Sequence, residues 1–511
     1  MNWKYRSSSD WSTPTVKIKR DGQWIALSSA QPGNPTDEFG WSDPPTRSST
    51  VLHSDIGGSI QDAFDSLSSD TELVLDDGPY EETATLPTTN QITIMGESSG
   101  TIWNAPGPVH RVLDAPEWSL ETTSCDAIDE GESTLSVGNT SEFESGDDLE
   151  ILDSSDLYYG LGSDDLNDNH TQYKGEFAVV ESVDTDNDTI TIEDEVHQEY
   201  ANPNGDLQVS SIDWGLTDIH ITNLDFYGGV SRDELDPYGP QPAKPMHLSQ
   251  LKDVWITDCT ADGWHQDLVT VAQGRNSYIA DCYVHDIGRY GISHTDGWTH
   301  SRVQDCAGGY IDPDESGYLV QAGGGSTDEP DRPAPTYDVQ ARDCTCETSD
   351  FLYEAHFAAE NVRYYDGDID SGNSRVCKMR GIDQHLIGGT YSPATGWAFQ
   401  SSQVARECSI EDAYISDANH GWVLWPREDQ WFGNLLMRDV QWEDMDGSPV
   451  YFRETDDGQA PDIRGIEIIN SSWNGEWIDD AAIESSNGFE SSRVDYSTEY
   501  PDDQTPAEYF D

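Results

Sequence analysis

Short segments in which apolar and polar residues alternate recur throughout residues 253–454. They are rich in Val, Ile, Tyr and Trp and are separated by turn residues, a pattern that is typical of β-strands. Asp258 and Asp281 are 23 residues apart, and Asp281 and Asp305 are 24 residues apart. A nearly constant period of this size indicates stacked coils, because each coil can bury its apolar residues only against its neighbours. We therefore predict an all-β fold, a right-handed parallel β-helix. The clearest copies begin at Val254, Tyr278, Arg302 and Val339, and weaker ones at Val362, Leu386, Ser409 and Leu435.

An Asp-Cys pair occupies the same point of the four clearest copies. The cysteines are Cys259, Cys282, Cys306 and Cys344. We expect them to stack inside the coils, where a thiol behaves as a small apolar residue. Metal binding is the alternative, but the spacing of Cys344-Thr-Cys346 is not the Cys-x-x-Cys of zinc sites. We predict neither a metal nor a cofactor, and the sequence leaves disulfides open for Cys125, Cys377 and Cys408.

The segments before the coils predict a cap and an insertion. Residues 59–67 have helical spacing and precede strand-like segments at 71–80 and 91–96. This order resembles the opening of pectate-lyase-like β-helices, which implies that the helix covers the open edge of the first coil. Residues 111–212 break the coil rhythm with alternating strands and acidic loops, which predicts a small inserted antiparallel β subdomain. One long step between coils is explained by a loop at 323–336 that is rich in Gly, Pro, Asp and Ser. The predicted organisation is an N-terminal attachment segment and linker (1–47), a capping helix with the first coils (48–110), the insertion (111–212), the main β-helix (213–485) and an acidic C-terminal segment without a strong element (486–511).

The composition is strongly acidic. The 511 residues include 98 acidic and 26 basic ones, which gives a formal net charge of -72. Such an excess often accompanies disorder, but 17 Trp, 23 Tyr and the strand pattern can supply a buried core. A dense carboxylate surface with little Lys is typical of proteins from extreme halophiles, in which molar salt screens the charges. The composition therefore predicts the environment of the host.

The first residues differ from the rest of the chain. Lys4, Arg6, Lys17, Lys19 and Arg20 place five of the 26 basic residues in the first 20 positions. The segment around the last three alternates about an Asp-Gly turn, which predicts a β-hairpin. A cationic hairpin on an anionic protein favours docking to an acidic partner; an ordinary capping strand is the alternative. The chain has no apolar run near the ~20 residues of a membrane span and no secretory signal at its start. We therefore expect no membrane insertion, and either an intracellular protein or a particle component made in the cytoplasm without a signal peptide and released by lysis.

A second strand in each coil carries candidate chemistry. Since side chains alternate along a strand, placing its apolar residues inside turns a polar set outward. That set is His294, Asp296, Gln321, Glu354, His356, Lys378, Arg380, Gln400, Trp425, Arg427 and Arg453. Parallel strands stack about 4.8 Å apart, so these residues are expected to form one polar strip. Its cations would attract an acidic ligand and its Trp offers a platform for a sugar ring, whereas the alternative is that the cations only neutralise neighbouring carboxylates.

The strip allows two kinds of catalysis. Asp296 and Glu354 would be two coils apart, about 9–10 Å at the backbone, and inverting glycoside hydrolysis uses carboxylates about 6.5–9.5 Å apart. Glu354 would then be the general acid, and Asp296 would activate water. In the alternative, His356 or Lys378 removes a proton beside a uronate carboxylate while Arg380 stabilises the enolate. We predict Asp296, Glu354 and His356 as catalytic and the other residues of the strip as substrate-binding.

The coil pattern, the opening helix and the insertion together resemble the pectate-lyase-like β-helix superfamily over residues 50–485, and more narrowly viral tail spikes and fibres. Polygalacturonase-like members carry Asn-Thr-Asp, Asp-Asp and Gly-His-Gly motifs, of which this chain shows only the related His294-Thr-Asp296. The segment Val254-Trp-Ile-Thr-Asp-Cys259 is similar to a Val-Trp-Ile-Asp-His element of pectate lyases but lacks its His, so no calcium site is carried over.

The resemblance implies a virion surface protein of a haloarchaeal virus that binds a host glycan or glycoprotein, with or without cleavage. It further implies a homotrimer that contacts other virion proteins through residues 1–47 and does not bind nucleic acid. The alternative is a stand-alone polysaccharide lyase or glycoside hydrolase that acts on an acidic polysaccharide.

Overall fold

A computed structural model describes residues 17–20, 23–26 and 44–510, apart from 77, 98–100, 108–110, 158–172, 203, 237–242, 316, 324–334, 357, 370–374, 394–395, 427–430, 455–461, 487, 492 and 502–503. Its contacts divide the chain into two units, 1–45 and 46–511. In the first unit, β1 (Lys17–Arg20) pairs antiparallel with β2 (Gln23–Ala26), which is the hairpin that the sequence predicts.

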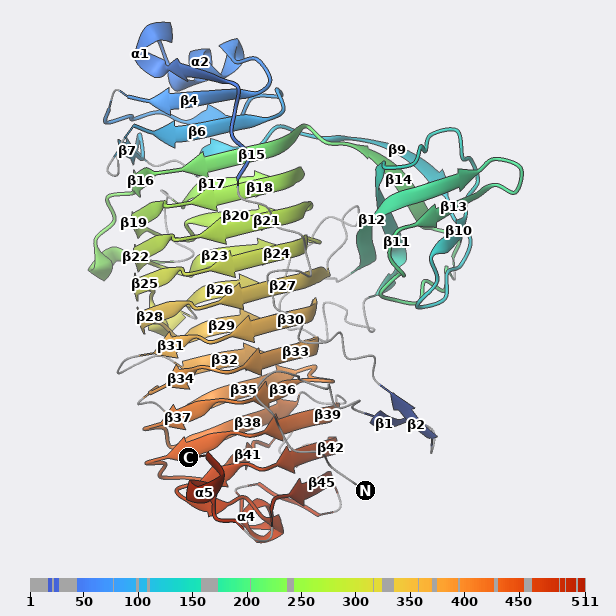
Figure 1. Cartoon of the computed structure of the whole chain (residues 1–511), viewed down its shortest axis with the longest axis vertical. Helices are drawn as coiled ribbons and strands as arrows, with labels where there is room; N and C mark the ends of the chain where they lie inside the picture. The colour runs from blue at the N-terminus through green and yellow to red at the C-terminus, as the bar shows by residue number, and fades with distance from the viewer. Residues whose placement is uncertain are drawn as a thin grey trace. The chain divides into compact units, whose positions relative to one another are not determined.

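The second unit is a right-handed parallel β-helix built from three sheets, as Figure 1 shows. Each full coil contributes one strand to each sheet, in the order exemplified by β18, β19 and β20. The fourteen-stranded sheet contains β3 (Ser49–Leu52), β4 (Thr71–Leu75), β6 (Ile92–Gly96), β15 (Leu216–Thr222), β18 (Leu251–Thr257), β21 (Arg275–Ala280), β24 (Thr299–Gln304), β27 (Thr336–Arg342), β30 (Ala359–Tyr365), β33 (Ile382–Ile387), β36 (Ser409–Glu411), β39 (Trp431–Arg438), β42 (Asp462–Ile469) and β45 (Val494–Glu499).

The other two sheets follow the same order of coils. The twelve-stranded sheet contains β7 (Thr101–Asn104), β16 (Leu224–Tyr227), β19 (Thr260–Trp264), β22 (Tyr283–Ile287), β25 (Ala307–Tyr310), β28 (Thr345–Thr348), β31 (Asp368–Ile369), β34 (Thr390–Tyr391), β37 (Tyr414–Ser416), β40 (Gln441–Glu443), β43 (Ser472–Trp473) and β44 (Glu476–Trp477). The eleven-stranded sheet contains β5 (Ala84–Thr85), β8 (Arg111–Asp114), β17 (Lys244–Ser249), β20 (Val269–Ala272), β23 (Tyr290–Thr295), β26 (Tyr318–Ala322), β29 (Phe351–Ala355), β32 (Arg375–Met379), β35 (Trp397–Gln403), β38 (His420–Pro426) and β41 (Val450–Phe452).

A left-handed residue begins each of the corners named here between the fourteen-stranded and twelve-stranded sheets, and at Gly388 a second glycine with positive φ follows. The backbone N–H of Asp258 donates to the carbonyl of Ala280, and that of Asp281 donates to Gln304, so the corners stack coil on coil. Asp and Asn enter the left-handed region more readily than other residues with a side chain, which explains the recurring Asp of the sequence. The corner residues are Asn223, Asp258, Asp281, Asp305, Asp343, Asp366, Gly388, Asp412, Asp439 and Asn470, with φ between 47° and 77°. The predicted register of the coils is therefore confirmed.

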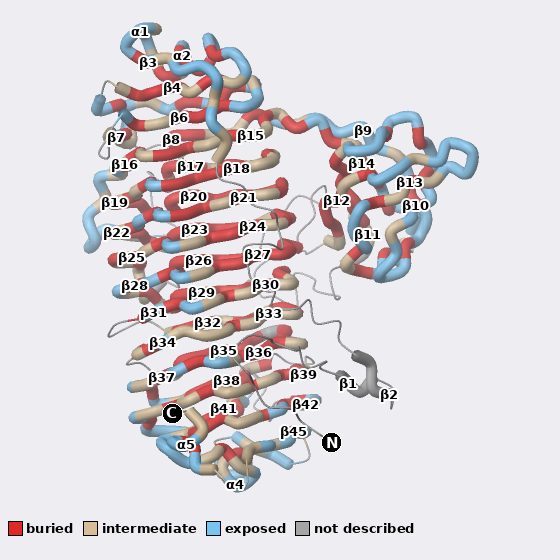
Figure 2. Tube along the Cα trace, in the orientation of Figure 1, coloured by how far each residue is buried: buried red, intermediate tan, exposed pale blue. Residues whose placement is uncertain are grey.

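The core fills the inside of the coils. Ile, Val, Leu and Trp side chains from all three sheets form one continuous cluster, and Figure 2 shows that buried residues follow the strands of the stack. Cys259, Cys282, Cys306 and Cys344 lie in this core as expected. All eight cysteines are buried free thiols, so none of the three open candidates forms a disulfide.

Both ends of the stack are covered. Near the N-terminal end, α1 (His53–Ile56) is followed by α2 (Ile60–Ser66), the helix that the sequence predicts. Ser59 and Asp62 form a capping box at the start of α2, and Ile60, Ala63 and Phe64 bury its apolar face. At the other end, the expectation of no strong element after 485 is wrong. There, β45 adds a parallel strand to β42, and α5 (Pro506–Phe510) follows α4 (Asp480–Glu484).

The insertion is a six-stranded antiparallel sheet with its own apolar core. Strand β8 belongs to the β-helix, so the inserted sheet begins at β9. Its strands are β9 (Ser119–Ser124), β10 (Thr134–Ser136), β11 (Asp148–Leu157), β12 (Tyr173–Asp184), β13 (Thr189–Ile192) and β14 (Leu207–Asp213). Two short 3-10 helices, η2 (Arg232–Glu234) and η3 (Pro313–Glu315), lie in loops.

Candidate functional site

The outer face of the eleven-stranded sheet carries most of the predicted strip. The register aligns outward-facing residues into columns along the stack. One column is Thr270, Ser293, Gln321, Glu354, Lys378, Gln400 and Val423. A second column passes two residues further along each strand and includes His356, Arg380, Ser402, Trp425 and Arg453. Eight of the eleven predicted residues therefore lie in two adjacent columns of one face.

His294 does not face outward, so its predicted direction is wrong. It pairs with Val271 and Ala322, whose side chains point into the core, and it is itself completely buried. Its Nε2 lies 2.5 Å from the hydroxyl of Ser301, and its Nδ1 lies 3.3 Å from the carbonyl of Gln321. Burial lowers the pKa of His294 to about 4, so the imidazole is a neutral core residue. The physical reason is that the predicted alignment of this strand is wrong by one residue. Ile292, not Ser293, pairs with the inward-facing Val269.

Asp296 and Arg427 also stand apart from the columns. Asp296 follows the end of β23 in a left-handed conformation, with φ 50°. It lies in the turn after the strand, while β26 separates β23 from the strand that holds Glu354. Arg427 lies outside the described residues.

The centre of the face is an ion-pair group that we call the charged cluster. Glu354 is completely buried although the register turns it outward. Arg380 forms an ion pair with its carboxylate, and the Lys378 Nζ lies 3.9 Å from the same oxygen. On the strand ends beside them, Arg375 lies 3.1 Å from Asp350. The cluster thus consists of Asp350, Glu354, Arg375, Lys378 and Arg380, three cations facing two carboxylates.

Asp350 interacts electrostatically with all three cations. Burial raises its pKa, and the charges of Arg375, Lys378 and Arg380 oppose that rise only in part. Asp350 is therefore easier to protonate than an exposed Asp.

Aromatic side chains line the cluster on one side. Tyr290 and Tyr318 stack with ring centroids 5.5 Å apart, and Phe351 continues the row 6.0 Å from Tyr318. The Arg375 guanidinium lies over the Phe351 ring at 5.0 Å and over the Trp397 ring at 4.2 Å. Each residue of this aromatic row stands three residues before the column of Glu354 in its strand. It holds the long cationic side chains against the sheet.

Lys378 connects the row to the cluster, because its Nζ lies 3.2 Å from the Tyr318 hydroxyl. Tyr318 and Phe351 are buried beneath these side chains, whereas Trp397 and Trp425 are half-buried. Arg453 lies over the Trp425 ring at 3.5 Å and covers one of its faces.

Sequence reasoning missed Asp350, Arg375 and Tyr318. Arg375 stands two residues before Cys377, whose side chain lies in the core, so alternation alone assigns Arg375 to the inward-facing set. Tyr318 pairs with Phe351, and both are apolar enough to be assigned to the core by pattern alone. The signal that could have found them is the start of each strand, which lies two residues earlier than the aligned segments.

The arrangement favours binding over acid catalysis by Glu354. A general acid must deliver a proton to a substrate, but this carboxylate is buried beneath two cations that neutralise it. It positions Lys378 and Arg380 instead. The described residues hold no group of three or more His, Cys, Asp or Glu side chains suited to a metal ion. No helix in the described part of the chain is both long and apolar enough to cross a membrane.

No model of a known protein family matches the chain. No curated protein matches it. Among solved structures, the tailspike protein gp49 of Pseudomonas phage LKA1 is similar with a TM-score of 0.55 and 13% identity, over 84% of this chain and 76% of the tailspike chain. The gp54 tailspike of Acinetobacter baumannii bacteriophage AP22, in complex with A. baumannii capsular saccharide, gives a TM-score of 0.50 and 11% identity, over 87% of this chain and 75% of that chain. The chain resembles these phage tailspikes in fold.

Proposed function

We propose that this protein is a tailspike-like component of a virion surface that binds a host-cell glycan along the outer face of the eleven-stranded sheet. The observation that carries the proposal is the charged cluster, which gathers three of the chain's 26 basic residues around the two carboxylates of Glu354 and Asp350. The similar AP22 tailspike was solved with capsular saccharide, which supports a saccharide as the ligand class.

The ligand we infer is an acidic saccharide. On a protein with a net charge of -72, an anionic polymer is repelled everywhere except where cations collect. Arg375, Lys378 and Arg380 outnumber the carboxylates of the cluster by one, and guanidinium groups match the bidentate geometry of a uronate carboxylate. Trp397 and Trp425, half-buried beside them, offer ring faces for sugar rings.

The finer assignments belong to the same proposal. The acidic composition supports a halophilic host and hence a haloarchaeal virus. The hairpin of β1 and β2, with the basic residues around it in the sequence, supports attachment of residues 1–47 to other virion proteins, and a homotrimer is the assembly we propose. Cleavage, if it accompanies binding, would use His356 or Lys378 as base with Arg380 as the electrostatic partner.

The test is binding of a uronate polymer, polygalacturonate, to the full chain at about 0.15 M and about 2 M salt, since screening must weaken a cluster-driven interaction. Lys378→Met and Arg380→Met should each reduce affinity about tenfold or more, as loss of a charged hydrogen bond does. Neutral dextran should not compete. New reducing ends or unsaturated products during the same incubation would reveal cleavage.

A matched control separates the site from general electrostatics. Arg342 on the fourteen-stranded sheet is ion-paired with Asp343 and is about as exposed as Arg375. Arg342→Met should leave binding unchanged. If Arg342→Met weakens binding as much as Arg380→Met does, binding depends on the net charge of the protein rather than on the charged cluster, and the proposed site is wrong.

A further inference from the structure

The insertion docks on an outward column of the fourteen-stranded sheet. That column is Lys252, Arg275, Thr299, Tyr337 and Glu360. At one end, the Asp148 carboxylate of the insertion lies 2.7 Å from the Lys252 Nζ and 3.1 Å from Arg275. At the other end, the His197 ring of the insertion stacks on Tyr337 with centroids 4.4 Å apart. The two bodies are therefore bonded on both sides of Thr299.

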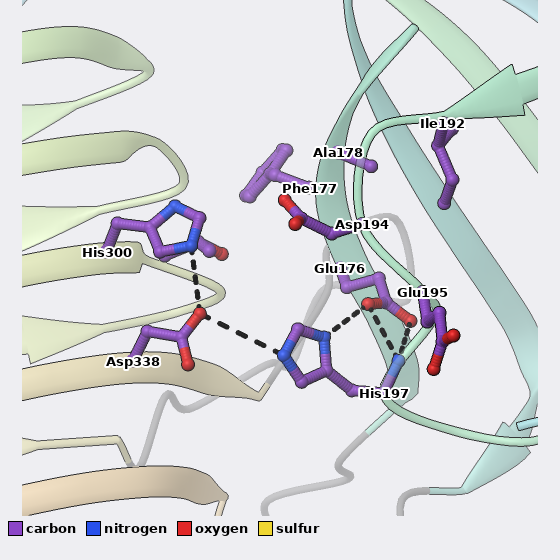
Figure 3. Close-up of a pocket in the computed structure, with 10 residues that line it drawn as sticks. Glu176, Phe177, Ala178, Ile192, Asp194, Glu195, His197, His300 and Asp338 are labelled. Carbon is purple, nitrogen blue, oxygen red and sulfur yellow. Dashed lines mark hydrogen bonds and ion pairs between the residues drawn. The ribbon is translucent and has the colours of Figure 1, made fainter. Parts of the chain in front are cut away.

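Between these contacts lies a hollow of about 140 Å³, shown in Figure 3. Phe177, Ala178 and Ile192 form an apolar wall on the insertion side. Thr299 and His300 line it from the β-helix. A cavity needs at least about 10–15 Å³ on this scale to hold one water, so the hollow has room for several waters or one small ring.

Thr299 supplies a polar group that lacks a partner. Its side chain is 1% exposed, and its hydroxyl has no hydrogen-bond partner among the described residues. Its register aims it at the insertion, between Arg275 and Tyr337, which both contact that insertion. Buried hydroxyls are almost always hydrogen-bonded, so an unpartnered one that lines a hollow indicates a place for a ligand.

The charge of the hollow is negative. Four carboxylates line it, from Glu176, Asp194, Glu195 and Asp338. Against them stands His197, whose Nδ1 lies 2.7 Å from Glu176 and whose Nε2 lies 3.9 Å from Asp338 (Figure 3). Burial alone would lower the pKa of His197, but the hydrogen bond and charge of Glu176, aided by Asp338, raise it to about 10.

The acidic residues that line the hollow therefore outnumber its imidazoles. Glu176 and Asp338 are already bonded to imidazoles, because His300 also lies 2.9 Å from Asp338. Asp194 and Glu195 at the rim are both exposed, and Figure 3 shows that the Asp194 carboxylate points toward the β-helix whereas that of Glu195 points away from it.

We propose that this hollow binds a protonated amine carried on a small hydroxylated ring, the chemistry of a hexosamine with a free amino group. The Asp194 carboxylate would bind the ammonium, the Thr299 hydroxyl would hydrogen-bond a ring hydroxyl, and the wall of Phe177 and Ile192 would contact the apolar side of the ring. The site lies on another sheet than the charged cluster, so it does not rest on glycan binding there.

The test is isothermal titration of the full chain with D-glucosamine, compared with glucose, N-acetylglucosamine and ethanolamine. Glucosamine should bind, and the other three should bind at least about fivefold more weakly, the loss of one hydrogen bond or ion pair. If glucose or N-acetylglucosamine binds as tightly as glucosamine, the site does not recognise the ammonium group. If ethanolamine binds as tightly, the site does not recognise the ring. The absence of any binding heat with glucosamine would refute the proposed site.

Two variants locate the binding. Thr299→Val removes an unpartnered hydroxyl at constant shape, so the protein should stay folded with unchanged or higher stability while glucosamine affinity falls about fivefold or more. Asp194→Asn, at an exposed position, should lower affinity similarly. Thr336→Val, on β27 of the same sheet, is the matched control and should have no effect, because the Thr336 hydroxyl is also buried without a hydrogen-bond partner among the described residues but does not line the hollow. Normal glucosamine affinity in Thr299→Val and Asp194→Asn would refute this hollow as the site, whereas normal affinity in Arg380→Met distinguishes it from the charged cluster.

Discussion

Arg380 forms an ion pair with Glu354, a carboxylate that is completely buried on the outer face of β29. A residue on the outer face of a sheet is normally exposed to solvent, so the burial of Glu354 shows that neighbouring side chains cover it. Lys378 and Arg380 both lie one strand further along, on β32 and at its end. The pair thus holds two cations in fixed positions, which is what a site for an anion requires.

Replacing Arg380 with Met should lower the free energy of unfolding by about 3 kcal/mol. Removal of one partner of a buried ion pair costs about 3–5 kcal/mol because the other charge stays buried, and Lys378 at 3.9 Å offsets part of that loss here. Urea unfolding at constant salt measures it. Adding Glu354→Gln to Arg380→Met removes the stranded charge and should restore at least half of the loss.

The exposed pair of Arg464 and Asp462 is the control for this cycle. Its Arg side chain is 57% exposed, so Arg464→Met should change stability by less than about 0.5 kcal/mol. Strictly additive effects of Arg380→Met and Glu354→Gln would contradict the coupling that the structure shows.

The corner residues give a second prediction. Asp281 stacks between Asp258 and Asp305, and burial together with these two charges raises its pKa. Asp281→Asn should stabilise the protein by a few tenths of a kcal/mol at low salt, because Asn keeps the left-handed corner without the repulsion. Asp281→Ala should destabilise it by about 1 kcal/mol, since Ala tolerates that conformation poorly. Urea unfolding at low and molar salt separates the effects, because only the charge effect is screened.

The pH dependence has a definite sign. With its pKa raised in the folded state, Asp281 binds a proton more tightly when folded, so its contribution to stability improves as pH falls through the raised pKa toward the ordinary value of 3.8. Asn223 forms the equivalent corner in an earlier coil. Asn223→Asp should have the opposite effect to Asp281→Asn, and a gain in stability would contradict the repulsion argument.

The elements that the sequence predicts well are those set by local chemistry. The corner Asp residues recur because each coil needs a left-handed residue, and α2 begins at Ile60 because Ser59 and Asp62, three positions apart, form the capping box at its start. The coil fold follows from the same repetition. Strand β45 was missed because its apolar positions, such as Val494, are separated by acidic ones and its partner strand lies across a loop.

The site was harder to predict because it depends on strand parity and on contacts between distant segments. A shift of one residue in β23 turned His294 inward. Alternation places Glu354 and Arg380 on one face of the sheet. It does not show that their ion pair is buried, because that burial depends on side chains from neighbouring strands. Nothing in a single sequence indicates that Thr299 faces the insertion, since that contact joins two bodies with independent cores.

The buried thiols give a third prediction. Burial raises the pKa of Cys346 to about 11 and that of Cys408 to about 12, so neither forms a thiolate at neutral pH. None of the eight cysteines should react with an aromatic disulfide reagent in the native protein, and all should react in denaturant. Cys125 lies in the small core of the insertion and should become reactive first if that part opens locally. Rapid native reaction of Cys282 would contradict its place in the core.

The last prediction concerns the contact between His197 and its two carboxylates. The pKa of His197 is raised from 6.5 to about 10, so the stability that its charge contributes is fully present below pH 6.5 and is lost as pH rises toward 10. Burial would raise the pKa of Asp338, but His300, His197 and Asn361 lower it to about 2, so its contribution is lost only as pH falls below 3.8. Docking of the insertion should therefore be firmest between about pH 4 and 6.5.

Hydrogen exchange of β12, corrected for the intrinsic effect of pH, measures this docking. Protection should fall steadily between pH 6.5 and 10 in the natural chain. His197→Gln can still donate to Glu176 but carries no charge, so its protection should be lower near pH 6 and should change little over the same range. An unchanged pH dependence in this variant would show that another group governs the contact, and the charge of His197 would then have no part in holding the insertion to the β-helix.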